Sequence, residues 1–175
     1  INFCFSQPLT DKKISIQGAG SVGMHLAEHL ANDGANVFIS DIDKSKLENI
    51  DNPNINPIDD AFSLECDVFS PCALGAIFNE SSIKSLNCKI IAGGANNQLQ
   101  DLSIANALHN RDIIYIPDIL INSGGAIGLT KDLMKRNEVE TESDLMNIAY
   151  RVREALTESQ EKSINLQDTI RELII

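Results

Sequence analysis

The chain has 175 residues, enough for one domain with a substantial core but short for an enzyme with separate cofactor and substrate domains. Hydrophobic residues make up 43% and charged residues 22%, a composition typical of globular rather than disordered proteins. The 14 Lys and Arg against 25 Asp and Glu give a net charge of −11, which disfavours nucleic acids and membrane surfaces as partners. No stretch long enough to span a bilayer lacks Asp, Glu, Lys and Arg.

The start of the chain and its cysteines indicate the cellular compartment of the protein. The chain begins with Ile1, and residues 1–10 carry no positive charge, so they do not resemble a signal peptide. We expect residues 1–10 to be the remnant of an upstream segment and residues 11–175 to form the domain. The scattered cysteines form no C-x-x-C pair, which predicts reduced buried thiols in a cytoplasmic protein rather than a zinc site: Cys4, Cys66, Cys72 and Cys88.

Strands and helices are expected to alternate along the first two thirds of the chain. Apolar periodicity and turn residues predict strands at 13–17, 37–40, 67–69, 89–92 and 113–116, an edge strand at Ile55 or Ile58, and helices between Val22 and Gly34, at 44–50 and at 102–110. The repeated strand–helix order predicts an α/β fold of the doubly wound Rossmann type. In that fold, a mostly parallel sheet carries helices on both faces.

Beyond Gly125 the sequence is typical of helices alone. Thr141 to Asp144 (T-E-S-D) matches a capping box and predicts the start of a long helix. One face of that helix is an apolar stripe, which we expect to pack on the domain body, with a partner-binding face as the alternative: Leu145, Ile148, Ala149, Val152, Ala155 and Leu156.

A glycine turn is the strongest chemical signal. The segment from Gly18 to Gly23 (G-A-G-S-V-G) matches G-x-G-x-x-G and lies between a predicted strand and a predicted helix. Gly18 permits the tight turn, Gly20 lets a pyrophosphate approach the backbone, and Gly23 lets the helix pack closely on the strand. The free amides at the helix start then face the phosphates. We expect a dinucleotide on this turn, bound by Gly18, Ala19, Gly20, Ser21, Val22 and Gly23.

Asp41 ends the second predicted strand, roughly 20 residues after the turn. A carboxylate there accepts hydrogen bonds from the adenosine ribose and repels a 2′-phosphate. No Arg lies nearby, and Lys44 is the closest base in the sequence. These residues predict NAD rather than NADP as the cofactor.

A second motif favours a different site. His25 to His29 spells H-x-x-E-H, a pattern that binds zinc in some proteases. The helix that carries it must also open with the glycine turn and bury Val22, Leu26 and Leu30, and no third ligand is evident. We therefore interpret both residues as ordinary histidines and expect no metal.

Three downstream loops resemble those of a known family. They read S-P-C-A-L-G-A from Ser70, A-G-G-A-N-N-Q-L from Ala92 and P-D-I-L-I-N-S-G-G-A from Pro117. With the glycine turn and the S-D-I-D segment around Asp41, they resemble the cofactor domain of the glutamate/leucine/phenylalanine/valine dehydrogenases, and their compact spacing is most similar to the leucine branch.

The resemblance also implies roles for individual residues. Cys72 and Ala73 would lie beside the adenosine half of NAD. Asn96 would reach the α-carboxylate of the substrate near the nicotinamide, and Asn122 would bind the carboxamide, tasks that suit uncharged amides. Asn97 could instead cap the turn that follows it.

The resemblance implies a side-chain pocket as well. Leu120 and Ala126 would line it. The leucine branch often has a branched residue where Ala126 stands, so the pocket would be wider here, and phenylalanine or another bulky amino acid stays open as the substrate.

The resemblance further implies an activity that needs more than this chain. The catalytic Lys of the family lies in a glycine-rich segment of an N-terminal domain, and no such segment occurs here. We expect the full-length enzyme, a homo-oligomer, to deaminate an apolar L-amino acid oxidatively to a 2-oxo acid with NAD, and the isolated chain to be inactive. Two alternatives are a stand-alone NAD-binding module without catalysis and the cofactor domain of a glutamate dehydrogenase.

Overall fold

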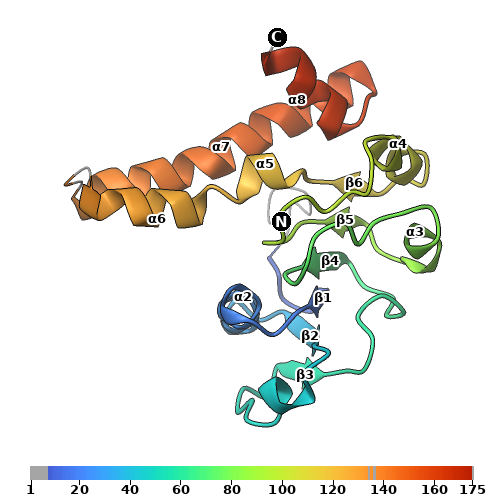
Figure 1. The fold of residues 1–175 in the computed structure, drawn as a ribbon, viewed down its shortest axis with the longest axis vertical. Helices are drawn as coiled ribbons and strands as arrows, with labels where there is room; N and C mark the ends of the chain where they lie inside the picture. Colours follow the sequence, from blue (N-terminus) through green and yellow to red (C-terminus); the bar gives the residue numbers. More distant parts are fainter. Residues whose placement is uncertain (1–7, 134, 136, 175) are drawn as a thin grey trace.

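The computed structural model describes residues 8–133, 135 and 137–174, and its elements are labelled as in Figure 1. In chain order they are β1 (Lys13–Gln17), α2 (Ser21–Asn32), β2 (Asn36–Ser40), the 3-10 helix η1 (Lys44–Leu47), β3 (Ile55–Pro57), β4 (Val68–Pro71), α3 (Ser82–Ser85), β5 (Ile90–Ile91), α4 (Ser103–His109), β6 (Ile114–Tyr115), α5 (Asp118–Ile121), α6 (Gly124–Leu133), α7 (Glu138–Lys162) and α8 (Leu166–Ile174). Most of the predicted cofactor-domain elements are confirmed within two residues, although the predicted helix at 44–50 is only the shorter η1.

The strands form one six-stranded sheet in the order β3-β2-β1-β4-β5-β6, and each neighbouring pair is parallel. The chain first winds outward from β1 to β3, then crosses back to β4 and winds the other way. This order confirms the predicted doubly wound α/β fold. It places a switch point between β1 and β4, where the loops at the carboxyl ends of the strands diverge and leave room for a ligand.

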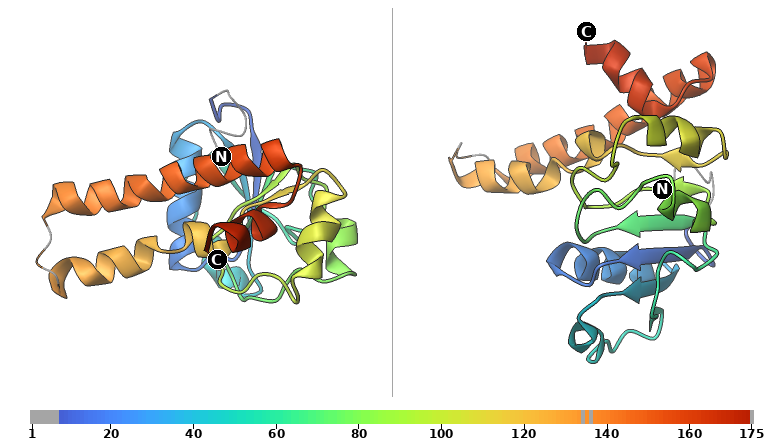
Figure 2. Two further views of the ribbon diagram at one scale, coloured as in Figure 1. Left: turned by 90° about the horizontal axis from the view of Figure 1, so that it is seen from above. Right: turned by 45° about the vertical axis from the view of Figure 1, so that its right-hand side comes forward.

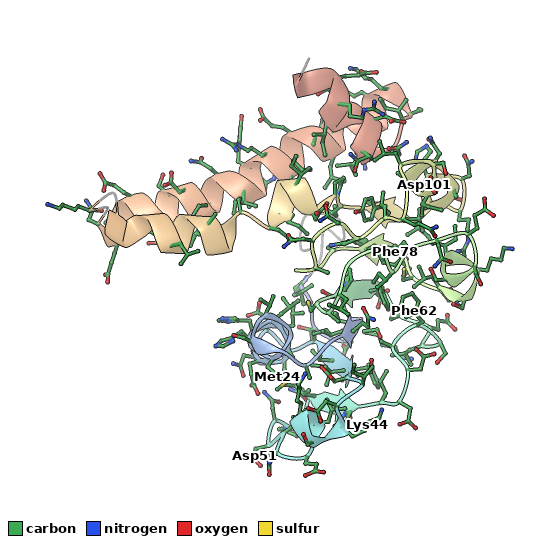
Figure 3. All side chains as sticks on the ribbon, viewed as in Figure 1. Met24, Lys44, Asp51, Phe62, Phe78 and Asp101 are labelled. Carbon is green, nitrogen blue, oxygen red and sulfur yellow. The ribbon has the colours of Figure 1, made fainter. Side chains whose placement is uncertain are left out.

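Helices cover both faces of the sheet, and each face has its own core. On one face, Ile14, Ile16 and Val37 pack with Ala27 of α2 and Leu156 of α7. On the other, α3 and α4 cover a second cluster that contains the tilted and edge-to-face rings of Phe62, Phe69, Phe78 and Tyr115. Figures 1 and 2 show α2 on one side of the sheet and α3 and α4 on the other, and Figure 3 labels Phe62 and Phe78 on the α3–α4 side.

The glycine-turn helix buries fewer of its apolar side chains than the sequence predicts. Leu30 is buried as expected and Leu26 is partly buried, but the Val22 side chain is 57% exposed. Val22 lies in the first turn of α2, before the helix reaches the sheet. It faces the loop after β5, because a Cβ added at Gly94 would lie only 2.5 Å from Val22 Cγ1.

The predicted start of the long helix is also wrong. Helix α7 begins at Glu138, three residues before Thr141, because Asn137 forms the capping box instead. Asn137 Oδ1 accepts from the Glu140 backbone N–H at 2.9 Å, and Glu140 Oε2 accepts from the Asn137 N–H at 3.0 Å. Thr141 lies inside the first turn, where its hydroxyl donates to the carbonyl of Asn137.

Helices α6 and α7 lie side by side and project away from the sheet on the side that carries α2 (Figures 1 and 2). The apolar stripe of α7 therefore packs on the domain body mainly in its C-terminal half, where Val152 packs on the core and Ala155 and Leu156 are buried, whereas Leu145 is 43% exposed. Despite the 25 residues of α7, the described part of the chain contains no helix that is both long and apolar enough to cross a bilayer.

The core reaches slightly beyond the predicted domain boundary. Leu9 is 5% exposed and belongs to the core on the α2 face, although the sequence places the domain start at residue 11. Of the predicted remnant at 1–10, residues 1–7 lie outside the described residues, and so does Cys4.

Candidate functional site

The glycine turn joins β1 to α2 at the carboxyl end of the sheet. Gly18 has φ +107°, a conformation that favours glycine, and its N–H donates to the Ser40 carbonyl at 2.7 Å. Gly20 is the N-cap of α2 and has no side-chain cap, so the first amides of the helix are available to a ligand. A Cβ added at Gly20 would meet nothing within 4 Å. The turn therefore has the open backbone surface that a pyrophosphate requires.

Gly23 has a different function from Gly20. A Cβ at Gly23 would lie 1.9 Å from the Gly18 carbonyl oxygen. No side chain can occupy that space, so Gly23 allows α2 to pack directly on the turn. The close contact explains why position 23 needs glycine, whereas the ligand role of Gly20 stays a prediction.

The loop after β4 lies against the same turn. A Cβ at Gly18 would lie 2.8 Å from Ala73 N and 2.9 Å from Cys72 C. Burial raises the pKa of the Cys72 thiol, so it is neutral at ordinary pH. Cys72 and Ala73 thus border the predicted dinucleotide site through their backbone, while Cys72 also serves as a half-buried packing residue.

Asp41 sits at the end of β2 and holds the turn from the other side. Its side chain is only 7% exposed. Oδ2 accepts from the Ala19 N–H at 2.8 Å, Oδ1 accepts from the Asp43 N–H at 2.8 Å, and Lys46 Nζ lies 3.2 Å from both oxygens. The base beside Asp41 is therefore Lys46. The sequence indicated Lys44, which instead pairs with Asp59 at 3.1 Å because η1 turns it away.

These contacts keep Asp41 ionised. Burial alone would raise the pKa of the carboxyl group, but the hydrogen bonds from Asp43, Ala19 and Lys46 and the charge of Lys46 outweigh burial and hold the pKa below its ordinary value. An ionised carboxylate at the end of β2 can accept hydrogen bonds from the ribose hydroxyls of a dinucleotide.

The lowered pKa predicts a pH-dependent contribution to stability. A carboxyl group that binds protons less tightly when folded stabilises the fold above its unfolded pKa of about 3.9 and loses that contribution as pH falls through the lower folded pKa. We expect Asp41→Asn to be less stable than the parent chain near pH 7 and this difference to shrink below about pH 4. Urea unfolding at several pH values measures it, and a pH-independent difference would argue against the ionised network.

Asn96 and Asn122 meet between the loops after β5 and β6. Asn122 Nδ2 lies 3.1 Å from Asn96 Oδ1 and also donates to the carbonyls of Gly94 and Ala95, at 3.0 and 2.8 Å. Carbonyl oxygens can only accept, so the amide nitrogen of Asn122, rather than Oδ1, must face the loop. Gly94 in turn contacts Val22 of α2, which connects the amide pair to the glycine turn.

The chain is similar to known proteins in both sequence and fold. The family profile described as Glutamate/Leucine/Phenylalanine/Valine dehydrogenase matches residues 38–169. The chain belongs to this family. It is 37% identical over 160 residues to a leucine dehydrogenase of Bacillus subtilis, covering 89% of this chain and 44% of the relative. It is 39% identical over 141 residues to a phenylalanine dehydrogenase of Lysinibacillus sphaericus, covering 76% and 37%.

The solved structure of L-tryptophan dehydrogenase from Nostoc punctiforme superimposes on the chain with a TM-score of 0.90. The sequences are 32% identical, and the match covers 95% of this chain and 51% of that one. The chain thus spans about half the length, or less, of the dehydrogenases it matches. The family resemblance predicted from five motifs is confirmed.

Two polar residues that were not predicted from the sequence hold these loops in place, the partly buried Asp118 and the fully buried Gln98. Asp118 Oδ2 accepts from the Asn97 N–H at 2.7 Å, and Asn97 adopts a left-handed φ of +51°. Gln98 is fully buried and donates to the carbonyls of Gly93 and Ala95. Asn97 is thus held through its backbone. Asp118 is part of the P-D-I-L motif, but its hydrogen bond to Asn97, 21 residues away, could not be predicted from the sequence.

The structure does not bring every predicted substrate residue together. Asn96 and Asn122 line a cavity of about 680 Å³ that also borders Asp118. Leu120 is instead half-buried against the core on the α2 face, and Ala126 is exposed on the first turns of α6. Their role in a side-chain pocket stays a prediction.

The histidines of the H-x-x-E-H motif lie on the outer side of α2. His25 and His29 are exposed, and His25 Nδ1 lies 2.6 Å from the Ser21 carbonyl. Over residues 8–133, 135 and 137–174, no group of three or more His, Cys, Asp or Glu is placed to hold a metal ion.

The three described cysteines are free. Cys66 is buried, whereas Cys72 and Cys88 are partly buried. Burial raises the pKa of Cys66 to about 12 and that of Cys88 to about 11, so both remain thiols at neutral pH.

Proposed function

We propose that residues 11–175, with Leu9, form the NAD-binding domain of an amino-acid dehydrogenase. The observation that carries this proposal is the pairing of an open glycine turn at Gly20 with the ionised Asp41 across it. The turn would take the pyrophosphate on the free amides of α2, and Asp41 would take the adenosine ribose. Cys72 and Ala73 would border the adenosine half.

The amide pair supports a catalytic rather than a purely regulatory role. Asn122 Oδ1 would accept from the carboxamide of the nicotinamide, and Asn96 would reach the α-carboxylate of the substrate. NAD, when bound, accepts the hydride from the α-carbon of the amino acid. The net reaction converts an L-amino acid, NAD and water to a 2-oxo acid, ammonium, NADH and a proton. A module that only sensed NAD would not need substrate-facing amides.

The substrate class is an apolar L-amino acid. The matched relatives act, by their names, on leucine, phenylalanine and tryptophan. Ala126, if it lines the side-chain pocket as in the family, favours a bulky side chain, because a small residue leaves more room.

The proposal extends to the whole protein and its setting. The dehydrogenase would include an N-terminal catalytic domain, supplying the lysine that activates water, and would assemble as a homo-oligomer. The free, partly buried thiols favour a reducing cytoplasm.

A pair of assays tests the proposal. We expect the 175-residue chain to bind NAD in isothermal titration calorimetry and to form no NADH with leucine, phenylalanine or tryptophan. The longer polypeptide that contains it should form NADH steadily with at least one of them. Absence of dinucleotide binding contradicts the proposal, and steady NADH formation by the chain alone contradicts the division of roles. Binding without turnover by the longer protein would favour the stand-alone module.

A further inference from the structure

The carboxylate of Asp41 has no acceptor capacity to spare in this structure. A carboxylate offers about four lone-pair positions, two on each oxygen. One position on Oδ2 is taken by the Ala19 N–H and one on Oδ1 by the Asp43 N–H. Lys46 Nζ lies 3.2 Å from both oxygens and takes the remaining two.

A ribose can reach Asp41 only by displacing one of these donors. The amides of Ala19 and Asp43 are part of the backbone of the glycine turn and of the entry to η1, so they cannot leave without unfolding those segments. Lys46 is different, because its side chain is 44% exposed and is carried by four flexible methylene groups. Lys46 is therefore the donor that the ribose hydroxyls must compete with.

Lys46 also changes the net charge next to the place where a 2′-phosphate would bind. Asp41 alone would present one negative charge, but the Lys46 ammonium neutralises it at contact distance. The other nearby base, Lys44, is paired with Asp59. A displaced Lys46 would stay within reach of the 2′ position and could donate to a phosphate there.

We propose that Lys46 is a second determinant of cofactor choice, which competes with the ribose of NAD for Asp41 and offers its ammonium to the 2′-phosphate of NADP. This inference rests on the proposed function, since it needs a dinucleotide on the glycine turn. It makes the site less selective for NAD than Asp41 alone would make it.

The test uses Lys46→Gln with Lys44→Gln as its matched control. Both variants remove one positive charge from η1, but only the first removes a partner of Asp41; Figure 3 labels Lys44 on this segment. Dissociation constants for NAD, NADP, 5′-AMP and 2′,5′-ADP are measured by calorimetry. The two mononucleotides report on the adenosine end alone.

Lys46→Gln should bind NAD and 5′-AMP about threefold more tightly, a small gain because an ion pair with a half-exposed Lys is weak. It should bind NADP and 2′,5′-ADP about tenfold more weakly, since a charge-assisted hydrogen bond to phosphate is lost. Lys44→Gln should change the ratio of the two affinities by less than about twofold. Lys46→Arg should restore most of the binding of 2′,5′-ADP.

Two results would overturn the inference while leaving the proposed function standing. One is an unchanged NAD-to-NADP ratio in Lys46→Gln. The other is an equal shift in Lys44→Gln, which would assign the effect to general charge. Failure of the parent chain to bind any of the four nucleotides would instead reject the proposed function.

Discussion

Gly20→Ala is expected to leave the fold intact and to weaken NAD binding on the order of a hundredfold, or about 2.7 kcal/mol. The backbone at Gly20 has φ −77° and ψ −174°, which alanine adopts without strain. A Cβ there would meet nothing within 4 Å. Neither the backbone conformation nor the packing of the protein therefore requires glycine at position 20. The methyl group would occupy the space through which a pyrophosphate approaches the amides at the start of α2.

Calorimetric titration with NAD measures the loss, and urea unfolding establishes that the variant is folded. Gly128→Ala is the control for affinity, because Gly128 lies on α6, away from the turn, and also has open space around it. Its NAD affinity should equal that of the parent chain. If Gly20→Ala bound NAD as tightly as Gly128→Ala does, the pyrophosphate would not lie on this turn.

The sequence predicted the sheet well because its strands are locally determined. The run at β1 is short and alternates polar and apolar residues, the run at β2 has an apolar centre, and each ends at glycine or Asp, so their limits follow from neighbouring residues. The start of α7 was misplaced because two consecutive segments, 137–140 and 141–144, each have the sequence of a capping box. Only the reciprocal bonds between Asn137 and Glu140 decide between them.

The candidate site could be predicted where a sequence motif has a known spacing between its residues. The glycine turn and Asp41 carry a known spacing, and the structure joins them through the hydrogen bond from Ala19. The Lys46 contact was missed because Lys44 and Lys46 lie only two residues apart, and the 3-10 geometry of η1 decides which one faces β2. The bonds of Asn122 to the loop after β5 span 26 to 28 residues, beyond the reach of sequence spacing.

Gly23→Ala should act on the fold itself, destabilising the chain by about 2–4 kcal/mol. A Cβ at Gly23 would lie 1.9 Å from the Gly18 carbonyl oxygen and 3.3 Å from Cys72 Cβ. The first of these atoms belongs to the backbone and cannot rotate away, so α2 must move off the turn or the turn must open. Alanine raises helix propensity by up to about 1 kcal/mol, which offsets only part of this cost.

Gly128→Ala separates the two effects, because it makes the same change inside a helix where a Cβ would meet nothing within 4 Å among the described residues. It should be as stable as the parent chain or more stable by up to about 1 kcal/mol. Urea unfolding followed by circular dichroism measures both variants. Gly20→Ala is expected to lose NAD binding and keep its stability, whereas Gly23→Ala is expected to lose stability. If Gly23→Ala were as stable as Gly128→Ala, α2 would not need to pack this closely on the turn. In that case the motif would serve the ligand alone rather than the ligand and the fold together.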